Sequence, residues 1–124
     1  MSAPDLVVIG GGAIGLAIAW RAAAAGIAVT VVDPAPGRGA SWAAAGMLAP
    51  VTEVHYGEES LLGLNLASSR RWPGFAAELE EASGQPTGYR GCGTLTVARD
   101  PDDNAALEQL YQYQLRLGLA VEGG

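Results

Sequence analysis

The stretch GGGAIG, Gly10 to Gly15, decides the fold, because it fits the pattern G-x-G-x-x-G and separates two segments of different character. Before it, residues 5–9 (DLVVI) form a short apolar run typical of a strand covered on both faces in a parallel sheet. After it, residues 13–25 are rich in strong helix formers and end before Gly26, a residue suited to the left-handed turn that closes a helix. The motif therefore joins a predicted strand to a predicted helix.

A second apolar, β-branched run follows the helix. Residues 27–32 (IAVTVV) end at Asp33 and Pro34, and the proline rules out further pairing inside a sheet. Strand, helix and strand within about thirty residues form one βαβ unit, whose strands are parallel and whose crossover is right-handed. The sequence therefore predicts an α/β protein of the Rossmann type.

The glycines have distinct expected roles in binding a dinucleotide. Gly10 allows the tight turn, Gly12 lets the backbone approach a pyrophosphate, and Gly15 lets the helix pack closely on the strand. The N–H groups and dipole of the helix start attract the anion, and Asp33 is placed to accept hydrogen bonds from ribose hydroxyls. The alternative, a glycine-rich turn without a ligand, is less favoured because the motif comes with its βαβ unit. NAD and FAD both remain possible at this point.

The rest of the chain predicts a long loop, two further helices and one strand. Residues 34–57 show no sustained periodicity, and a loop of this length needs a function. Apolar residues recur at helical spacing over 58–82, which predicts one helix kinked at Pro73, with a break near Arg71 as the alternative. Residues 94–98 alternate as in a half-buried strand. Asp100 is placed to cap a helix with one apolar face, formed by Ala106, Leu110, Tyr113 and Leu117.

Composition excludes several classes of function. The 124 residues carry 7 Lys and Arg against 13 Asp and Glu, a net charge of -6, so a nucleic-acid partner is not expected. A single cysteine excludes an internal disulfide and a multi-cysteine metal site, and no metal is expected. The apolar N-terminal run is too short for a membrane span or a signal peptide. We expect a soluble, cytoplasmic protein.

The segment GASWAAAGMLAP, residues 39–50, resembles the second flavin-contacting segment of the D-amino-acid-oxidase-like flavoproteins, most closely the glycine oxidases of thiamine biosynthesis. The resemblance favours FAD over NAD and extends weakly through residues 61–72 and to residues 89–95, which look like the first strand of that family's substrate domain. By position, it implies that a set of residues contacts the cofactor. With the motif glycines, the expected site is Gly10, Gly12, Ala13, Ile14, Gly15, Asp33, Pro34, Ala40, Ser41, Ala45, Gly46 and Met47.

The resemblance also implies an organisation and an activity. Residues 1–85 would be the N-terminal part of an incomplete FAD-binding domain and residues 86–124 the beginning of an α+β substrate domain, in a fragment of a longer enzyme. That enzyme would oxidise glycine or a related small amine with oxygen, releasing an imine and hydrogen peroxide, and could be a homo-oligomer. The family's substrate-binding arginine and tyrosines lie later in its chain, so no catalytic residue is expected here.

Other interpretations stay open. The chain could be a truncated, non-catalytic dinucleotide-binding module, a D-amino-acid or sarcosine oxidase or dehydrogenase, or an NAD-dependent dehydrogenase, although the last leaves residues 39–50 unexplained. His55 is the only histidine, but a solvated loop residue is a simpler interpretation than a general base. Cys92, between two glycines, is better explained as a small buried residue than as a nucleophile.

Overall fold

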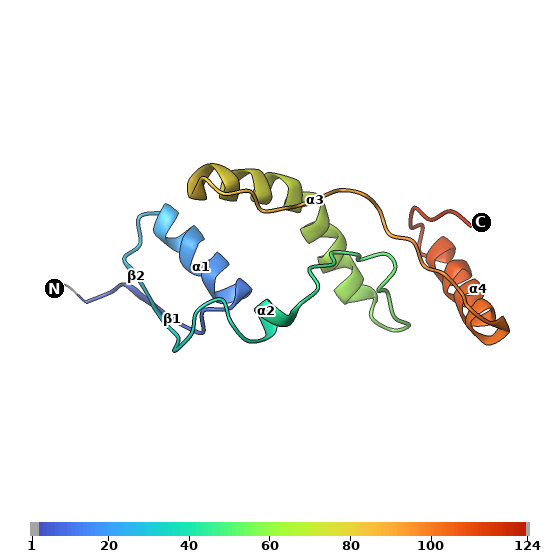
Figure 1. Cartoon of the computed structure of the whole chain (residues 1–124). Coiled ribbons are helices and arrows are strands. Elements are labelled where there is room, and N and C mark those ends of the chain that lie inside the picture. Colours follow the sequence, from blue (N-terminus) through green and yellow to red (C-terminus); the bar gives the residue numbers. More distant parts are fainter. Residues whose placement is uncertain (1–2, 124) are drawn as a thin grey trace. The chain divides into compact units, whose positions relative to one another are not determined.

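The computed structural model describes residues 3–123 and contains two strands and four helices in the order β1, α1, β2, α2, α3, α4 (Figure 1). These residues fall into two compact units, divided between Met47 and Leu48. The first unit holds the motif and the second holds the long helices. The predicted domain division after residue 85 stays a prediction.

The first unit is the predicted βαβ unit. Strands β1 (Leu6–Ile9) and β2 (Val29–Val32) pair in parallel, with Leu6 opposite Val29 and Ile9 opposite Val32. Helix α1 (Ala13–Ala24) connects them and buries Ala19. In both strands alternate residues are half-buried, as expected where one face of the sheet is covered and the other is not. The prediction of a parallel α/β unit is confirmed.

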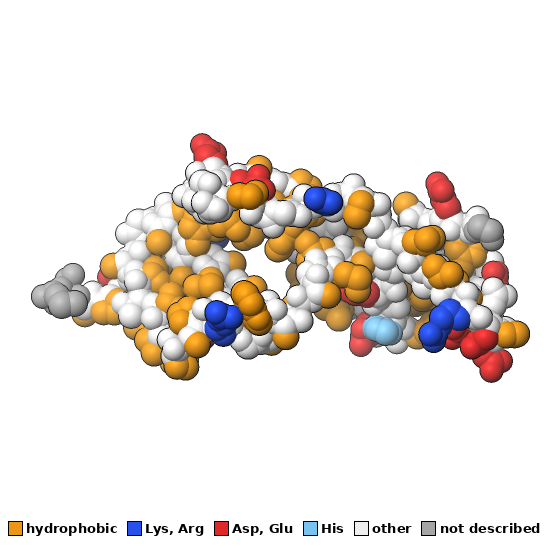
Figure 2. Space-filling model, in the orientation of Figure 1, with side chains coloured by type: hydrophobic (Ala, Val, Ile, Leu, Met, Phe, Trp, Pro, Cys, Tyr) orange, Lys and Arg blue, Asp and Glu red, His pale blue; other side chains and the backbone are white. Residues whose placement is uncertain are grey.

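Within the first unit, no element covers the other face of this sheet. Val7, Ile9 and Val32 point to it, and their side chains are at least half exposed. Figure 2 shows hydrophobic side chains gathered on the surface over the elements of this unit. The predicted strand pair therefore forms. Apolar strands of this kind are usually covered on both faces, but here the first unit covers only one.

Helix α1 ends where the sequence predicts. Gly26 has a φ of +83°, the left-handed conformation that L side chains rarely adopt. Its N–H donates to Ala23 O, and Ile27 N–H donates to Ala22 O, a pattern that satisfies the last carbonyls of the helix. The glycine turn thus returns the chain directly into β2.

The long loop contains one helical turn that the sequence analysis did not predict. Helix α2 (Ala40–Ala43) begins after Gly39, whose φ is +76°, and ends at Ala44 in an extended conformation. A run this short has too few residues to show helical periodicity, which is why sequence patterning missed it.

In the second unit, helix α3 (Glu59–Ser83) runs through Pro73 as one helix. The proline cannot donate a hydrogen bond to the preceding turn, and Figure 1 shows the helix bending between its two halves. Leu62 and Ala76 are buried on its less exposed face, and the helix ends at Gly84 in the left-handed conformation. The prediction of one kinked helix is confirmed, and the alternative of a break near Arg71 is wrong.

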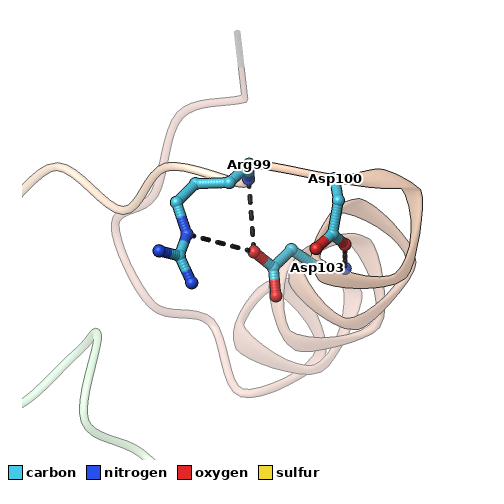
Figure 3. A network of polar contacts seen from close by, with 3 residues as sticks. All are labelled: Arg99, Asp100 and Asp103. Atoms are coloured by element: carbon cyan, nitrogen blue, oxygen red, sulfur yellow. Dashed lines mark hydrogen bonds and ion pairs between the residues drawn. The ribbon is translucent and has the colours of Figure 1, made fainter.

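Helix α4 (Pro101–Arg116) has the predicted start. The Asp100 side chain accepts a hydrogen bond from Asp103 N–H at 2.8 Å. The Asp103 carboxylate in turn accepts from Arg99 N–H at 3.3 Å and lies 3.7 Å from the Arg99 Nε atom (Figure 3). Each carboxylate therefore satisfies a backbone N–H group at the helix start; unlike in a capping box, the Asp103 carboxylate accepts from the residue before the cap. Because the Arg99 side chain is exposed, the ion pair itself adds little stability.

The core of the second unit forms where α3 and α4 meet the loop that precedes α3. Val54, Leu62 and Tyr113 are buried together, and the partly buried leucines packed on them are Leu66, Leu110, Leu117 and Leu119. The predicted apolar face of α4 is confirmed at Leu110, Tyr113 and Leu117, whereas Ala106 is exposed. Buried Gln114 is satisfied because its side-chain amide donates to Val51 O at 2.8 Å.

We expect Leu62→Ala to cost about 2–5 kcal/mol of unfolding free energy, since it removes a buried side chain and leaves a cavity. Leu64→Ala on the same helix is the matched control, because Leu64 is largely exposed and its loss should change stability by less than about 0.5 kcal/mol. Urea unfolding of the full-length protein measures both. Equal effects of the two substitutions would show that the core lies elsewhere.

The predicted strand at residues 94–98 is wrong. The structure has no strand in residues 85–99, and Leu95 and Val97 are exposed in an extended segment. An alternating sequence favours a strand only where a neighbouring strand accepts its backbone hydrogen bonds, and no strand pairs with it among residues 3–123. Of the expected fold, the parallel βαβ unit is therefore seen, and the start of an α+β substrate domain is not.

No helix within residues 3–123 has both the length and the apolar character needed to cross a membrane.

Candidate functional site

The candidate site lies in the first unit, which contains every position that the sequence analysis expects to contact a dinucleotide. The motif turn occupies the space between the end of β1 and the start of α1. The loop from Asp33 to Met47 follows β2 and includes α2. The geometry of these two segments shows how the expected residues are brought together.

Two of the motif glycines are required by the backbone. Gly10 has a φ of +100°, and its N–H donates to Val32 O at 2.9 Å. The first residue of the turn therefore still forms a hydrogen bond to the neighbouring strand. A Cβ atom on Gly15 would overlap the carbonyl oxygen of Gly10 and would lie 3.3 Å from Val8 Cγ1. Gly15 therefore lets α1 approach β1 at a distance that a side chain would prevent, as predicted.

Gly12 is the residue that precedes α1, and no side chain of its own caps the helix. Its backbone is extended, with φ −79° and ψ −177°, so the conformation does not require glycine. A Cβ atom here would meet only Ser41 Oγ, at 3.1 Å. What glycine provides at this position is space beside the helix start, which is the role expected for a close approach of phosphate.

Asp33 holds the motif turn against the end of β2. Its Oδ2 atom accepts a hydrogen bond from Gly11 N–H at 2.7 Å, and its Oδ1 atom accepts from Ala35 N–H, also at 2.7 Å. These two hydrogen bonds hold the pKa of the Asp33 carboxyl below its ordinary value of 3.8, and the bond from Gly11 has the larger effect. Each oxygen keeps a lone pair, so the carboxylate can still accept from a ribose hydroxyl. Asp33 therefore holds the backbone of the turn, a role that the sequence analysis does not predict, in addition to its predicted role of binding ribose.

Gly11 is a site residue that the sequence analysis missed, because the motif treats this position as variable. It is buried, and a Cβ atom on it would lie 3.0 Å from Pro36 Cβ and 3.1 Å from Asp33 Cβ. Its carbonyl accepts a hydrogen bond from Gly37 N–H at 2.7 Å. Gly11 is the one glycine of residues 10–15 that the motif does not require, which is a signal for a close approach here but not for its partner.

Ser41 connects the loop to the start of α1. Its Oγ atom accepts a hydrogen bond from Ala13 N–H at 2.9 Å, across 28 positions of sequence. The remaining expected contacts of the motif and of residues 34–47 are mostly exposed, with Ile14 and Met47 among the large hydrophobic ones. Arg38 lies over the Trp42 ring, 4.3 Å from its centroid, which gives this aromatic residue partial cover. Whether the expected residues contact a cofactor stays a prediction.

The lowered pKa of Asp33 sets a direction for the effect of acid. A carboxylate whose folded pKa is depressed stabilises the fold at pH values above its unfolded pKa, and this stabilisation is lost as the pH falls through the folded pKa. We expect a carbon-13 NMR titration of Asp33 to give a pKa below 3.8. Asp33→Asn should weaken the turn at neutral pH, because an amide accepts through one oxygen only. A titration at or above 3.8 would contradict the two hydrogen bonds.

Two titratable groups of the second unit, Glu59 and Tyr113, contact each other in its packing. Tyr113 donates its hydroxyl hydrogen to Glu59 Oε1 at 2.7 Å, and its ring stacks on Tyr56 with centroids 4.2 Å apart. The Glu59 carboxyl pKa is lowered and the Tyr113 pKa is raised by this hydrogen bond. Cys92 is exposed, contrary to the expectation that it is buried. No group of three His, Cys, Asp or Glu side chains within residues 3–123 is placed to hold a metal ion.

Comparison with known proteins adds a family and a set of relatives. Residues 5–123 match the sequence model of the family DAO, FAD dependent oxidoreductase. Bifunctional protein ThiO/ThiG from Synechocystis sp. is 39% identical over 130 residues, and that from Trichormus variabilis is 36% identical over 136 residues. The tRNA 5-methylaminomethyl-2-thiouridine biosynthesis bifunctional protein MnmC from Aromatoleum aromaticum is 36% identical over 102 residues.

Each match covers most of this chain but only a small part of the relative. The two ThiO/ThiG proteins match 97% of this chain, which corresponds to 20% and 21% of their own lengths. The MnmC protein matches 81% of this chain and 16% of its own length. The chain thus spans about a fifth of the length of the curated ThiO/ThiG relatives.

Proposed function

Because the chain belongs to the DAO family of FAD-dependent oxidoreductases, we propose that it binds FAD at the start of α1 and serves in the oxidation of glycine or a related small amine. Family membership confirms the resemblance seen in the sequence, and with it FAD rather than NAD as the cofactor. The substrate and the individual residues that contact FAD are our proposal.

The single observation that best supports the site is the space beside the start of α1. The first N–H groups of any α-helix have no acceptor inside the helix, and with the helix dipole they favour an anion. Gly12 leaves room for a close approach, and its built Cβ atom meets only Ser41 Oγ. The residues present therefore fit a pyrophosphate, which the backbone of this turn can approach without a side chain between them.

Asp33 fits the ribose next to that pyrophosphate. Its carboxylate is fixed in orientation by Gly11 and Ala35, and an oriented acceptor loses less entropy on binding a hydroxyl than a mobile one. The aspartate side chain is short, so the ribose would have to lie close to the end of β2. Residues 39–47 would lie along the remainder of the cofactor, where small side chains allow close contact.

The chemistry that bound FAD would supply is a two-electron oxidation: the substrate amine loses two electrons and two protons to become an imine, and oxygen gains them to become hydrogen peroxide. The residues of this chain would bind and orient the cofactor. We assign none of them to substrate recognition.

The cofactor assignment is tested by titrating the full-length protein with FAD and, separately, with NAD. We expect FAD to bind with a visible flavin spectrum that persists after dialysis, and NAD to bind weakly or not at all. Tight NAD binding with no measurable affinity for FAD would overturn the proposed site.

The substrate is tested by following hydrogen peroxide release with glycine, sarcosine, proline and D-alanine. We expect turnover with glycine or another small amine, in line with the resemblance to glycine oxidases of thiamine biosynthesis and with the ThiO/ThiG matches. The MnmC match favours a second candidate, an amine on a tRNA nucleoside that is a precursor of 5-methylaminomethyl-2-thiouridine. A net charge of -6 is unfavourable for a tRNA partner, so a modified tRNA is the comparison substrate whose preference would contradict the first candidate.

A further inference from the structure

The loop after β2 lies along the motif turn and contacts it at three residues spaced four positions apart. Asp33 accepts from Gly11 N–H at 2.7 Å, and Gly37 N–H donates to Gly11 O at 2.7 Å. Ser41 Oγ accepts from Ala13 N–H at 2.9 Å. The first two contacts hold the turn, whereas the third reaches the first residue of α1 and is the closest to the proposed phosphate position.

The Ser41 contact replaces a cap that α1 lacks. The residue at the capping position is Gly12, which has no side chain to accept an N–H group, and the first turn of α1 contains no acidic residue. Capping side chains usually come from the residue that begins the helix. Here the cap comes from a separate helical turn, α2, so the stability of the helix start depends on where the loop lies.

The backbone on both sides of Ser41 is held by the helical turn α2. Gly39 starts α2 in a left-handed conformation, and its carbonyl accepts from Trp42 N–H and Ala43 N–H, both at 3.1 Å. Ser41 therefore sits inside a closed turn. The same hydroxyl oxygen is the atom that a Cβ on Gly12 would meet, so Ser41 borders the space that the phosphate would use.

We propose that Ser41 is a positioning residue of the FAD site, which fixes residues 39–47 onto the start of α1 through its hydrogen bond from Ala13 N–H. This inference rests on the proposed FAD site. In this role Ser41 holds the loop in place before FAD binds, whether or not its side chain later contacts the cofactor. Without the bond, the motif and residues 39–47 form two separate segments, and the cofactor has to order the second one on binding.

The test removes the hydrogen bond from each end. Ser41→Ala deletes the acceptor. Ala13→Pro deletes the donor, and proline is tolerated at the first position of a helix, especially after a residue as extended as Gly12. We expect each variant to lower FAD affinity by roughly three- to tenfold, the effect of one hydrogen bond. The double variant should bind FAD as tightly as the single variant with the lower affinity, because both substitutions remove the same hydrogen bond.

Two controls accompany these variants. Ser41→Thr keeps the hydroxyl and should restore most of the affinity lost in Ser41→Ala. Ser68→Ala, at an exposed position of α3, should leave FAD affinity unchanged. If the losses of Ser41→Ala and Ala13→Pro multiply in the double variant, Ser41 and Ala13 act independently and the proposal is wrong.

A second measurement separates this proposal from the proposed function. Amide hydrogen exchange of Ala13, measured by NMR without FAD, should be at least about threefold faster in Ser41→Ala than in the parent and in Ser41→Thr. An unchanged exchange rate would overturn the proposal even if FAD binds. A protein that never binds FAD but shows the expected exchange would contradict the proposed function and leave the positioning contact supported.

Discussion

Gly15→Ala should abolish FAD binding by preventing α1 from packing on β1. The added Cβ atom overlaps the carbonyl oxygen of Gly10, and neither atom belongs to a flexible side chain that could turn away. Overpacking a well-packed site costs about 1–3 kcal/mol, and a backbone neighbour makes the cost larger. We expect the first unit to lose its fold, seen as loss of flavin absorbance in the purified full-length protein and a lower melting temperature.

Gly63→Ala is the matched control for this substitution. Gly63 lies inside α3, and a Cβ atom there meets nothing within 4 Å. The same chemical change should therefore stabilise the protein by about 0.5–1 kcal/mol, since alanine is the better helix former. If both variants bound FAD like the parent, the close approach of α1 to β1 would not exist in solution.

Gly12→Val should reduce FAD affinity by a factor of about 100 or more, equal to roughly 2.7 kcal/mol. The valine side chain would occupy the space beside the start of α1 and would press on Ser41 Oγ, which lies 3.1 Å from the position of its Cβ atom. The backbone at Gly12 is extended and accepts a β-branched residue, so folding should suffer less than binding. Equilibrium binding, followed by the quenching of flavin fluorescence, measures the loss.

Ala23→Val provides the comparison for Gly12→Val, because it adds bulk at an exposed position of the same helix, away from the motif. It should leave FAD affinity unchanged and lower stability slightly. Parental affinity in Gly12→Val would show that the phosphate does not approach this residue.

The first unit could be predicted from sequence because its information is local. The apolar run before Gly10, the helix formers after it and the left-handed turn at Gly26 each act within a few residues of chain. The predicted ranges 5–9, 13–25 and 27–32 therefore contain β1, α1 and β2, with at most two extra residues at one end of each. Pro73 was also interpreted correctly as a kink, because apolar spacing on both sides of it keeps one helical phase.

Contacts between distant residues could not be predicted in the same way. Nothing near Ser41 in the sequence indicates that its hydroxyl accepts from Ala13 N–H, and nothing near Gly11 indicates contact with Gly37. Residues 94–98 show the reverse error, since a strong local pattern predicted a strand that has no pairing partner among the residues described. A strand depends on a neighbour, whereas a helix satisfies its own backbone.

The open face of the β1–β2 sheet has a consequence for the order of events during synthesis. The paired residues of β1 and β2 are 23 positions apart, so the contacts of the first unit are local and can form soon after residue 33 leaves the ribosome. Val7, Ile9 and Val32 nevertheless remain exposed in that unit, and within residues 3–123 no further strand pairs with the outer edge of β1 or β2. Early folding of this unit thus leaves an apolar face and free strand edges, and both favour aggregation until another surface covers them.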